Sequence, residues 1–90
     1  MPTLKLKFFA DPGHGWLGVK RDLLADLQLL PLITRYSYQR GRTVYLEEDC
    51  DAHRFLEAAK AAGYTFTIEH KHTDKNSPIR SYERFVYALD

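Results

Sequence analysis

Residues 33–48 read ITRYSYQRGRTVYLEE, two runs with strand-forming composition on either side of QRGR. Val, Ile, Thr and Tyr favour extended backbone. Gly41 can adopt the positive φ that a tight turn or a bulge requires. This stretch predicts a β-hairpin, and it is the strongest hairpin signal in the chain.

The segment before this hairpin has helical periodicity over residues 20–30. Its apolar positions are Leu23, Leu24, Leu27 and Leu30. Its polar positions are Lys20, Arg21, Asp22, Asp26 and Gln28. The spacing predicts an amphipathic helix. We expect Pro31 to end it, because proline cannot continue a helix.

The segment after the hairpin predicts a second helix. Asp49 or Asp51 is a candidate N-cap, and Gly63 is a candidate stop signal. The residues between them form one apolar stripe, made of Ala52, Phe55, Leu56, Ala59 and Ala62. The start and stop signals therefore agree.

Strand patterns lie at both ends of the chain. Residues 3–9, TLKLKFF, and residues 64–72, YTFTIEHKH, alternate apolar and polar side chains, as half-buried strands do. Residues 11–15, DPGHG, predict a turn, and WLGV after it a short returning strand. Residues 79–90 predict a last strand or a docked tail.

With the short N-terminal hairpin strand set aside, the order of elements is βαββαβ. That order predicts a single α+β domain over residues 1–90, a ferredoxin-like two-layer sandwich. Both helices are expected on one face of an antiparallel sheet. Its open edges could pair with a second copy, which makes a homodimer one expected form.

Composition limits the range of functions. Thirteen Lys and Arg balance twelve Asp and Glu, for a net charge of +1, so binding to a polyanion requires a local patch. We expect the single cysteine, Cys50, to be a small buried hydrophobe in a reducing, cytoplasmic setting. No apolar run approaches the roughly 20 residues of a membrane span.

Two groups of residues could hold a metal ion. His70 and His72 share one side of a strand, with further candidate ligands at His14, His53 and the acidic run 47–51, EEDCD. That acidic run could instead hold Mg²⁺. We favour a solvated strand end for the histidines and helix capping for the acidic run. No cofactor and no catalytic residue is predicted.

Arginine and tyrosine cluster in the hairpin and in the C-terminal segment. The candidate partner-binding residues are Arg35, Tyr36, Tyr38, Arg40, Arg42, Arg80, Tyr82 and Arg84. Tyr36 and Tyr38, two residues apart on a predicted strand, are expected to share a face on which bases could stack while arginines meet phosphates. The same mixture suits an acidic protein partner equally well, so both partner classes stay open.

Three stretches carry a resemblance: ADPGHGWLGV at 10–19, YSYQRGRTVYLEEDCD at 36–51 and HTDKNSPIRSY at 72–82. Together they resemble a group of small uncharacterised proteins of tailed phages and other mobile elements. The resemblance implies a non-enzymatic accessory protein that acts in the bacterial host cell by binding. Such proteins commonly block a host defence or replication component.

The sharpest form of this hypothesis is an anti-CRISPR or anti-restriction protein whose partner is a host protein or ribonucleoprotein complex. The near-neutral charge differs from that of strongly acidic DNA mimics. One alternative is a nucleic-acid-binding module that uses Tyr36 and Tyr38. Another is a metal-dependent hydrolase that uses His70 and His72.

Overall fold

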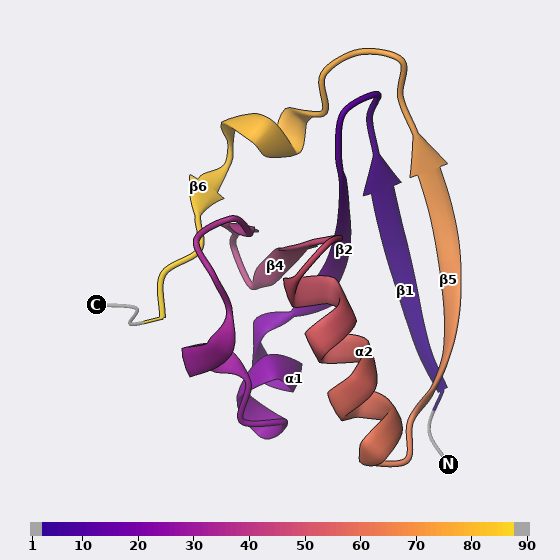
Figure 1. Ribbon diagram of the computed structural model, residues 1–90, viewed down its shortest axis with the longest axis vertical. Helices are drawn as coiled ribbons and strands as arrows, with labels where there is room; N and C mark the ends of the chain where they lie inside the picture. The colour runs from indigo at the N-terminus through magenta and orange to yellow at the C-terminus, as the bar shows by residue number, and fades with distance from the viewer. Residues whose placement is uncertain (1–2, 88–90) are drawn as a thin grey trace.

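The computed structural model describes residues 3–87 (Figure 1). The strands are β1 (Thr3–Ala10), β2 (Gly15–Lys20), β3 (Tyr38–Arg40), β4 (Thr43–Glu47), β5 (Thr65–His72) and β6 (Glu83–Arg84). The α-helices are α1 (Arg21–Asp26) and α2 (Asp51–Ala61), and the 3₁₀ helices are η1 (Leu30–Leu32) and η2 (Pro78–Ser81). The strands form one sheet in the order β5-β1-β2-β4-β3-β6.

The sheet is mixed. Strand β1 pairs in parallel with β5 along its whole length, from Thr3 opposite Thr65 to Ala10 opposite His72. The other neighbouring strands pair antiparallel. The long parallel pair forms because the β1–β2 hairpin reverses the chain, and the crossover through α2 then returns it beside β1.

Both helices cover the same face of the sheet, which gives two layers (Figure 1). Leu24 of α1 and Phe55 of α2 are each 0% exposed. They belong to one apolar cluster with Leu6, Leu17 and Leu46 from the central strands. The alternation of the strands puts these leucines on one side, so the opposite side of the sheet is left without a helical layer.

The predicted α+β two-layer architecture is confirmed, whereas the fully antiparallel sheet is wrong. The predicted returning strand is β2, which lies in the centre of the sheet between β1 and β4. The β3–β4 hairpin forms as predicted, and Gly41 has a φ of 59° at its turn. With β2 inserted in the sheet, β1 runs antiparallel to β2 on one side but parallel to β5 on the other. In the ferredoxin-like fold all neighbouring strands are antiparallel.

Helix α1 is shorter than predicted. It ends at Asp26 because Gln28 adopts a φ of 60°. Leu29 N–H donates to the Leu24 carbonyl at 2.8 Å, and Gln28 N–H donates to the Ala25 carbonyl at 3.0 Å. These two bonds are a Schellman motif with glutamine at the position that glycine usually takes. Pro31 therefore lies inside η1 and does not end the first helix.

Helix α2 ends as predicted but begins differently. Gly63 has a φ of 96°, and Tyr64 N–H donates to the Ala59 carbonyl at 3.0 Å, so the predicted stop signal is confirmed. The N-cap is Cys50, which makes no side-chain capping bond. The prediction of an aspartate N-cap is therefore wrong. The prediction of a buried cysteine is also wrong, because Cys50 is exposed.

The C-terminal segment is both a short strand and a docked tail. Strand β6 pairs with β3, and Phe85 after it is 2% exposed in the core. Arg21, predicted on the polar side of the first helix, is buried and donates to the Val86 carbonyl at 3.1 Å and to the Tyr87 carbonyl. Its guanidinium lies 5.2 Å from the centre of the Phe85 ring. The rest of the predicted tail, residues 88–90, lies outside the described residues.

Replacing Gln28 by glycine is expected to stabilise the protein. A residue with a side chain is strained in the left-handed conformation, and glycine removes that strain. We expect this gain to exceed the loss caused by the greater conformational entropy of glycine in the unfolded chain. We expect the free energy of unfolding to rise by about 0.5–1 kcal/mol in urea titrations. Ala25→Gly, inside the right-handed helix α1, should lower it by a similar amount. A loss of stability in Gln28→Gly would contradict this explanation of the helix end.

Candidate partner-binding site

The sheet face without α-helices, hereafter the open face, carries a second apolar cluster. Its buried members are Trp16, Tyr38 and Ile79, and its partly buried members are Phe9, Tyr45 and Tyr82. Cross-strand pairing places these aromatic rings side by side, because Phe9 lies opposite Trp16 and Tyr38 opposite Tyr45. Ile79 comes from η2, so η2 covers only the part of this face above Trp16.

A buried carboxylate holds η2 in place. Asp11 is 6% exposed and accepts bonds from Arg80 Nε at 2.6 Å and Nη2 at 2.9 Å. It also accepts from the main-chain N–H groups of Ser77 at 2.9 Å, Gly13 at 3.0 Å and His14 at 2.9 Å. The Arg80 guanidinium, followed by these N–H groups, holds the pKa of Asp11 far below its usual range. The β1–β2 turn and η2 are thereby joined.

Arginine side chains lie against the aromatic rings of the open face. The Arg84 guanidinium carbon is 4.5 Å from the centre of the Tyr38 ring, and that of Arg40 is 4.9 Å from the Tyr82 ring. These four residues with Arg35 and Tyr36 are hereafter called the arginine–aromatic ridge. Arg80 makes a similar contact with Trp16 at 5.4 Å, but its charge is already paired with Asp11.

The ridge brings together residues that the sequence had only grouped by composition. Arg35, Tyr36 and Arg84 line one shallow hollow, and Arg84 Nη1 donates to the Arg35 carbonyl at 3.2 Å. Tyr36 is 69% exposed. It precedes β3, which begins at Tyr38, so the prediction that both tyrosines share one strand face is wrong. Tyr38 itself is only 8% exposed.

A second buried aspartate positions the loop that carries Arg35 and Tyr36. Asp51 Oδ2 accepts from Thr34 N–H at 3.0 Å, from Thr34 Oγ1 at 2.7 Å and from Ser37 Oγ at 2.6 Å. These contacts bracket the loop on both sides of its exposed residues. Asp51 is 0% exposed, and its Oδ1 has no hydrogen-bond partner among residues 3–87. The aspartate predicted to cap α2 thus ties the start of the helix to the loop that precedes β3.

The five predicted arginines divide into two groups. Arg42 donates from Nη2 to both carboxylate oxygens of Asp22, at 2.7 and 2.6 Å, and Arg80 is bound to Asp11. Within the described part of the chain, Arg35, Arg40 and Arg84 have no ion pair with a carboxylate. These three guanidinium groups therefore keep their charge available to a partner.

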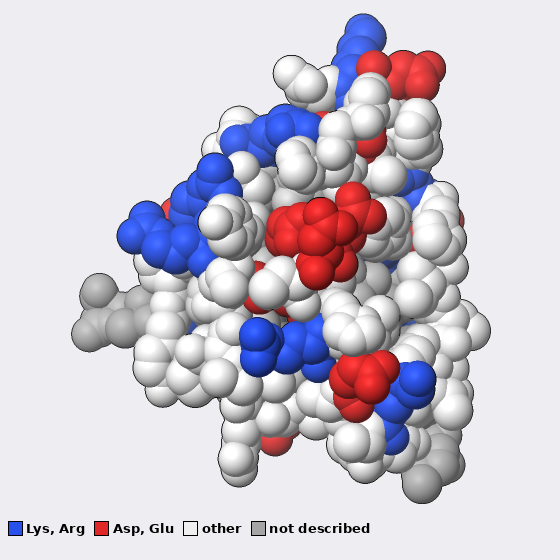
Figure 2. Space-filling view, viewed as in Figure 1, with Lys and Arg blue, Asp and Glu red and all other residues white. Residues whose placement is uncertain are grey.

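Acidic residues lie next to the ridge. Glu47 and Asp49 line a hollow together with Tyr36 and Arg84. Figure 2 shows basic side chains gathered where η2 and β6 lie and a compact acidic group near the start of α2. A partner on this surface would meet positive charge over the ridge and negative charge beside it.

The predicted histidine pair lies at the opposite edge of the sheet from β6. His70 and His72 are exposed at the end of β5, and the His70 ring centre is 5.6 Å from that of Phe8. His72 Nδ1 is 3.7 Å from Asp74 Oδ1. Over residues 3–87, no group of three or more His, Cys, Asp or Glu side chains could hold a metal ion. The candidate ligands His14 and His53 are thus not gathered around the pair.

Comparisons with known proteins give no assignment. No protein-family model, no curated protein and no solved structure matches this chain. None of the helices within residues 3–87 has the length and apolar character needed to cross a bilayer. Any proposal about function therefore depends on the site itself.

Low pH should weaken the protein partly through Asp11. Because its pKa is lowered in the folded state, the carboxylate contributes full stability above about pH 4, the unfolded value. That contribution is lost as pH falls further. Urea titrations between about pH 5 and pH 2 should show a smaller loss of unfolding free energy in Asp11→Asn than in the wild type.

The control for this measurement is Asp74→Asn, because the Asp74 side chain is 98% exposed. It should keep the pH dependence of the wild type. If Asp11→Asn also keeps that dependence, protonation of Asp11 and loss of its ion pair with Arg80 do not cause the loss of stability at low pH.

Proposed function

We propose that the protein acts by binding, and that the arginine–aromatic ridge docks onto an acidic surface of a protein partner. The observation that supports this most strongly is that Arg40 and Arg84 lie on ring faces, at 4.9 and 4.5 Å, without an ion pair among residues 3–87. Exposed arginines without such support would not favour one surface over another.

Stacking prepares these arginines for binding. A guanidinium group on a ring keeps its N–H edge free for a carboxylate, and two N–H groups can bond one carboxylate in parallel. Its side chain has already lost much of its rotamer freedom in the free protein, which lowers the entropic cost of association. Arginine and tyrosine are also enriched among the residues that dominate binding energy.

The same contacts favour a protein over a nucleic acid at this position. Tyr38 is 8% exposed and lies beneath Arg84, so a base cannot stack on that ring, and Tyr36 is left as a single exposed tyrosine outside the strand. Glu47 and Asp49 border the adjoining hollow and would repel phosphates. A protein surface can match both signs of charge, which is the complementarity that protein interfaces use.

The resemblance to small phage and mobile-element proteins supplies a biological setting. We infer that the partner belongs to a host defence complex, such as a CRISPR ribonucleoprotein or a restriction enzyme, and that the protein acts in the bacterial cytoplasm by occluding it. We also infer that the fold elaborates the ferredoxin-like arrangement. Without β2, the neighbours β5, β1, β4 and β3 follow the ferredoxin-like sequence of strands.

Removing the two stacked arginines should abolish capture of the partner. The tagged wild type and the Arg40→Ala/Arg84→Ala variant would be compared in pull-downs from a bacterial host, followed by titration calorimetry with the purified protein that is retained. Each truncated hot-spot arginine costs roughly 2 kcal/mol. Such values are not additive, so we take the loss of one arginine as the lower limit and expect affinity to fall by at least about 30-fold.

The matched control is Arg54→Ala, an exposed arginine on α2 that lies on the helix side. It should bind the partner within about twofold of the wild type. Retention of nucleic acid without any bound protein, or equal binding by all three proteins, would overturn the proposed docking surface.

The proposed setting is tested in infected cells. A host with an active CRISPR or restriction system should give more plaques when it expresses the wild type than when it expresses the double arginine variant. Plaque counts that match the empty vector for every defence system tested, despite confirmed partner binding, would remove the anti-defence role and leave the docking surface intact.

A further inference from the structure

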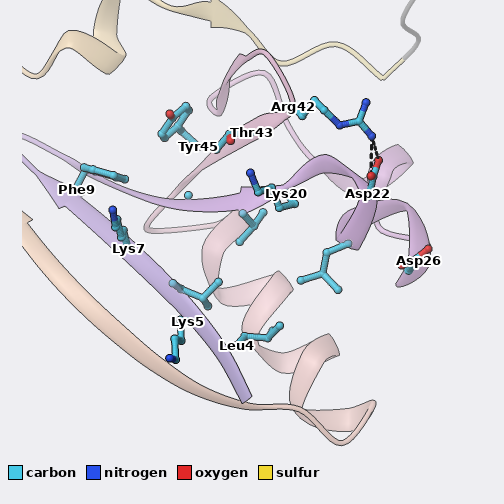
Figure 3. Close-up of a pocket in the computed structure, with 14 residues that line it drawn as sticks. Leu4, Lys5, Lys7, Phe9, Lys20, Asp22, Asp26, Arg42, Thr43 and Tyr45 are labelled. Carbon is cyan, nitrogen blue, oxygen red and sulfur yellow. Dashed lines mark hydrogen bonds and ion pairs between the residues drawn. The ribbon is translucent and has the colours of Figure 1, made fainter. Parts of the chain in front are cut away.

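A cleft opens in the sheet where β1 and β2 separate. The two strands pair only from Lys7 opposite Gly18 to Ala10 opposite Gly15. Beyond that point Val19 and Lys20 pair with β4, while residues 3–6 of β1 pair with β5. The edge of β1 that faces β2 therefore has no strand partner over residues 3–6, and a cleft of about 870 Å³ lies there (Figure 3).

The floor and one end of this cleft are apolar. Leu4, Leu6, Val19 and Leu23 line it at the level of the core. At one end lie the rings of Phe9 and Tyr45, whose centres are 5.8 Å apart at an angle of 66°. Both rings are partly exposed.

Gly18 allows these two rings to meet. It lies on β2 between them, and a Cβ atom there would be 3.4 Å from Phe9 Cε2 and 3.6 Å from Tyr45 Cε1. Any longer side chain would have to occupy the space above the rings. Because Gly18 has no side chain, this end of the cleft stays open toward solvent.

Lysines line the sides of the cleft. Figure 3 shows Lys5 and Lys7 along β1, with Lys20 across the opening on β2. All three are exposed, and none has a carboxylate within ion-pair distance among residues 3–87. Two aspartates also line the cleft, Asp22, which is bound by Arg42, and Asp26; with Arg42 counted, four cationic side chains stand against these two acidic ones. The ligand that this cleft attracts is therefore anionic.

We propose that this cleft binds a single-stranded nucleic acid. Its phosphates lie on Lys5, Lys7 and Lys20, and one base enters the opening between β1 and β2. Phe9 and Tyr45 provide the aromatic contact that bases in unpaired strands use. This site lies on the open face but is separate from the arginine–aromatic ridge, so it extends the proposed function to a second class of ligand.

The spacing of the lysines suits a strand of phosphates. Lys5 and Lys7 are two residues apart on one strand, which puts their side chains on the same face about 7 Å apart. This is comparable to the distance between successive phosphates in an extended single strand. Lysine binds phosphate as a point charge and does not require the paired geometry of a carboxylate.

The open edge of β1 supplies hydrogen bonds for the base. Main-chain N–H and C=O groups without a strand partner can bond the edges of an unstacked base, whereas in a duplex those edges are already paired. A duplex is also too wide to place a base between two strands of one sheet. A fatty acid could satisfy the lysines but would leave the open edge of β1 unpaired. An acidic peptide could pair with that edge but would not stack a planar ring on Phe9 and Tyr45 unless it carried an aromatic residue.

The test is a titration with fluorescein-labelled oligouridine and oligothymidine, followed by fluorescence anisotropy at several salt concentrations. Contact with three phosphates should give a slope of log affinity against log salt of about −2. Affinity would then fall about 20-fold between about 50 mM and about 200 mM salt. In Lys5→Gln/Lys7→Gln the slope should shrink to about −0.7 and affinity at low salt should drop.

Two further variants separate the parts of the site. Tyr45→Leu should weaken binding while the salt slope stays near −2, because the lost contact carries no charge. Arg54→Gln, on the helix side, should change neither quantity. Arg84→Ala should leave oligonucleotide affinity within about twofold of the wild type. The proposal for this cleft and the proposal for the ridge are therefore tested independently.

Several outcomes would overturn the proposal. Absence of binding at low salt would do so, as would a slope that is unchanged in Lys5→Gln/Lys7→Gln. Duplex DNA that binds as tightly as the single strands would exclude the entry of a base. Equal, lysine-dependent binding of polyglutamate would replace nucleic acid by an acidic peptide.

Discussion

The bond between Asp11 and Arg80 determines what the open face of the sheet can do. Its partners are 69 residues apart in the chain, yet the carboxylate is 6% exposed and takes both guanidinium bonds at 2.6 and 2.9 Å. A buried charge without its partner is strongly destabilising. The chain can therefore bury Asp11 only with η2 folded over Trp16, and this in turn brings Tyr82 and Arg84 onto the face beside β3.

Local sequence patterns predict the elements whose conformation depends on neighbouring residues alone. The alternation in residues 3–9 predicts β1 because apolar side chains face the core and polar ones face solvent along a half-buried strand. Gly41 and Gly63 mark real turns, since both have positive φ. The Asx-type bonds from Gly13 and His14 to Asp11 also had a signal, because Asp-Pro-Gly favours such turns.

Features that depend on contacts between residues far apart in the chain could not be predicted from the neighbouring sequence. Arg21 fits the polar side of an amphipathic helix, yet carbonyl oxygens 65 and 66 residues away bury it. Gln28 has ordinary helix propensity, and its left-handed φ is imposed by Leu29, which packs into the core at 5% exposure. The arginines of the site were found by composition, but which of them are free depends on where Asp11 and Asp22 lie in the fold.

The junction between β2 and α1, which follow each other without a linker, positions both the cleft and the ridge. Lys20 pairs with Thr43, and the next residue, Arg21, donates its N–H to the Arg42 carbonyl at 2.8 Å. The Arg21 side chain is bound to the tail beyond Phe85, which follows β6 directly. The end of β2 is thus held on the side of β4 and cannot return to β1. Because all of these contacts lie within the chain itself, the fold holds the opening beside β1 apart, and occupying it requires little rearrangement.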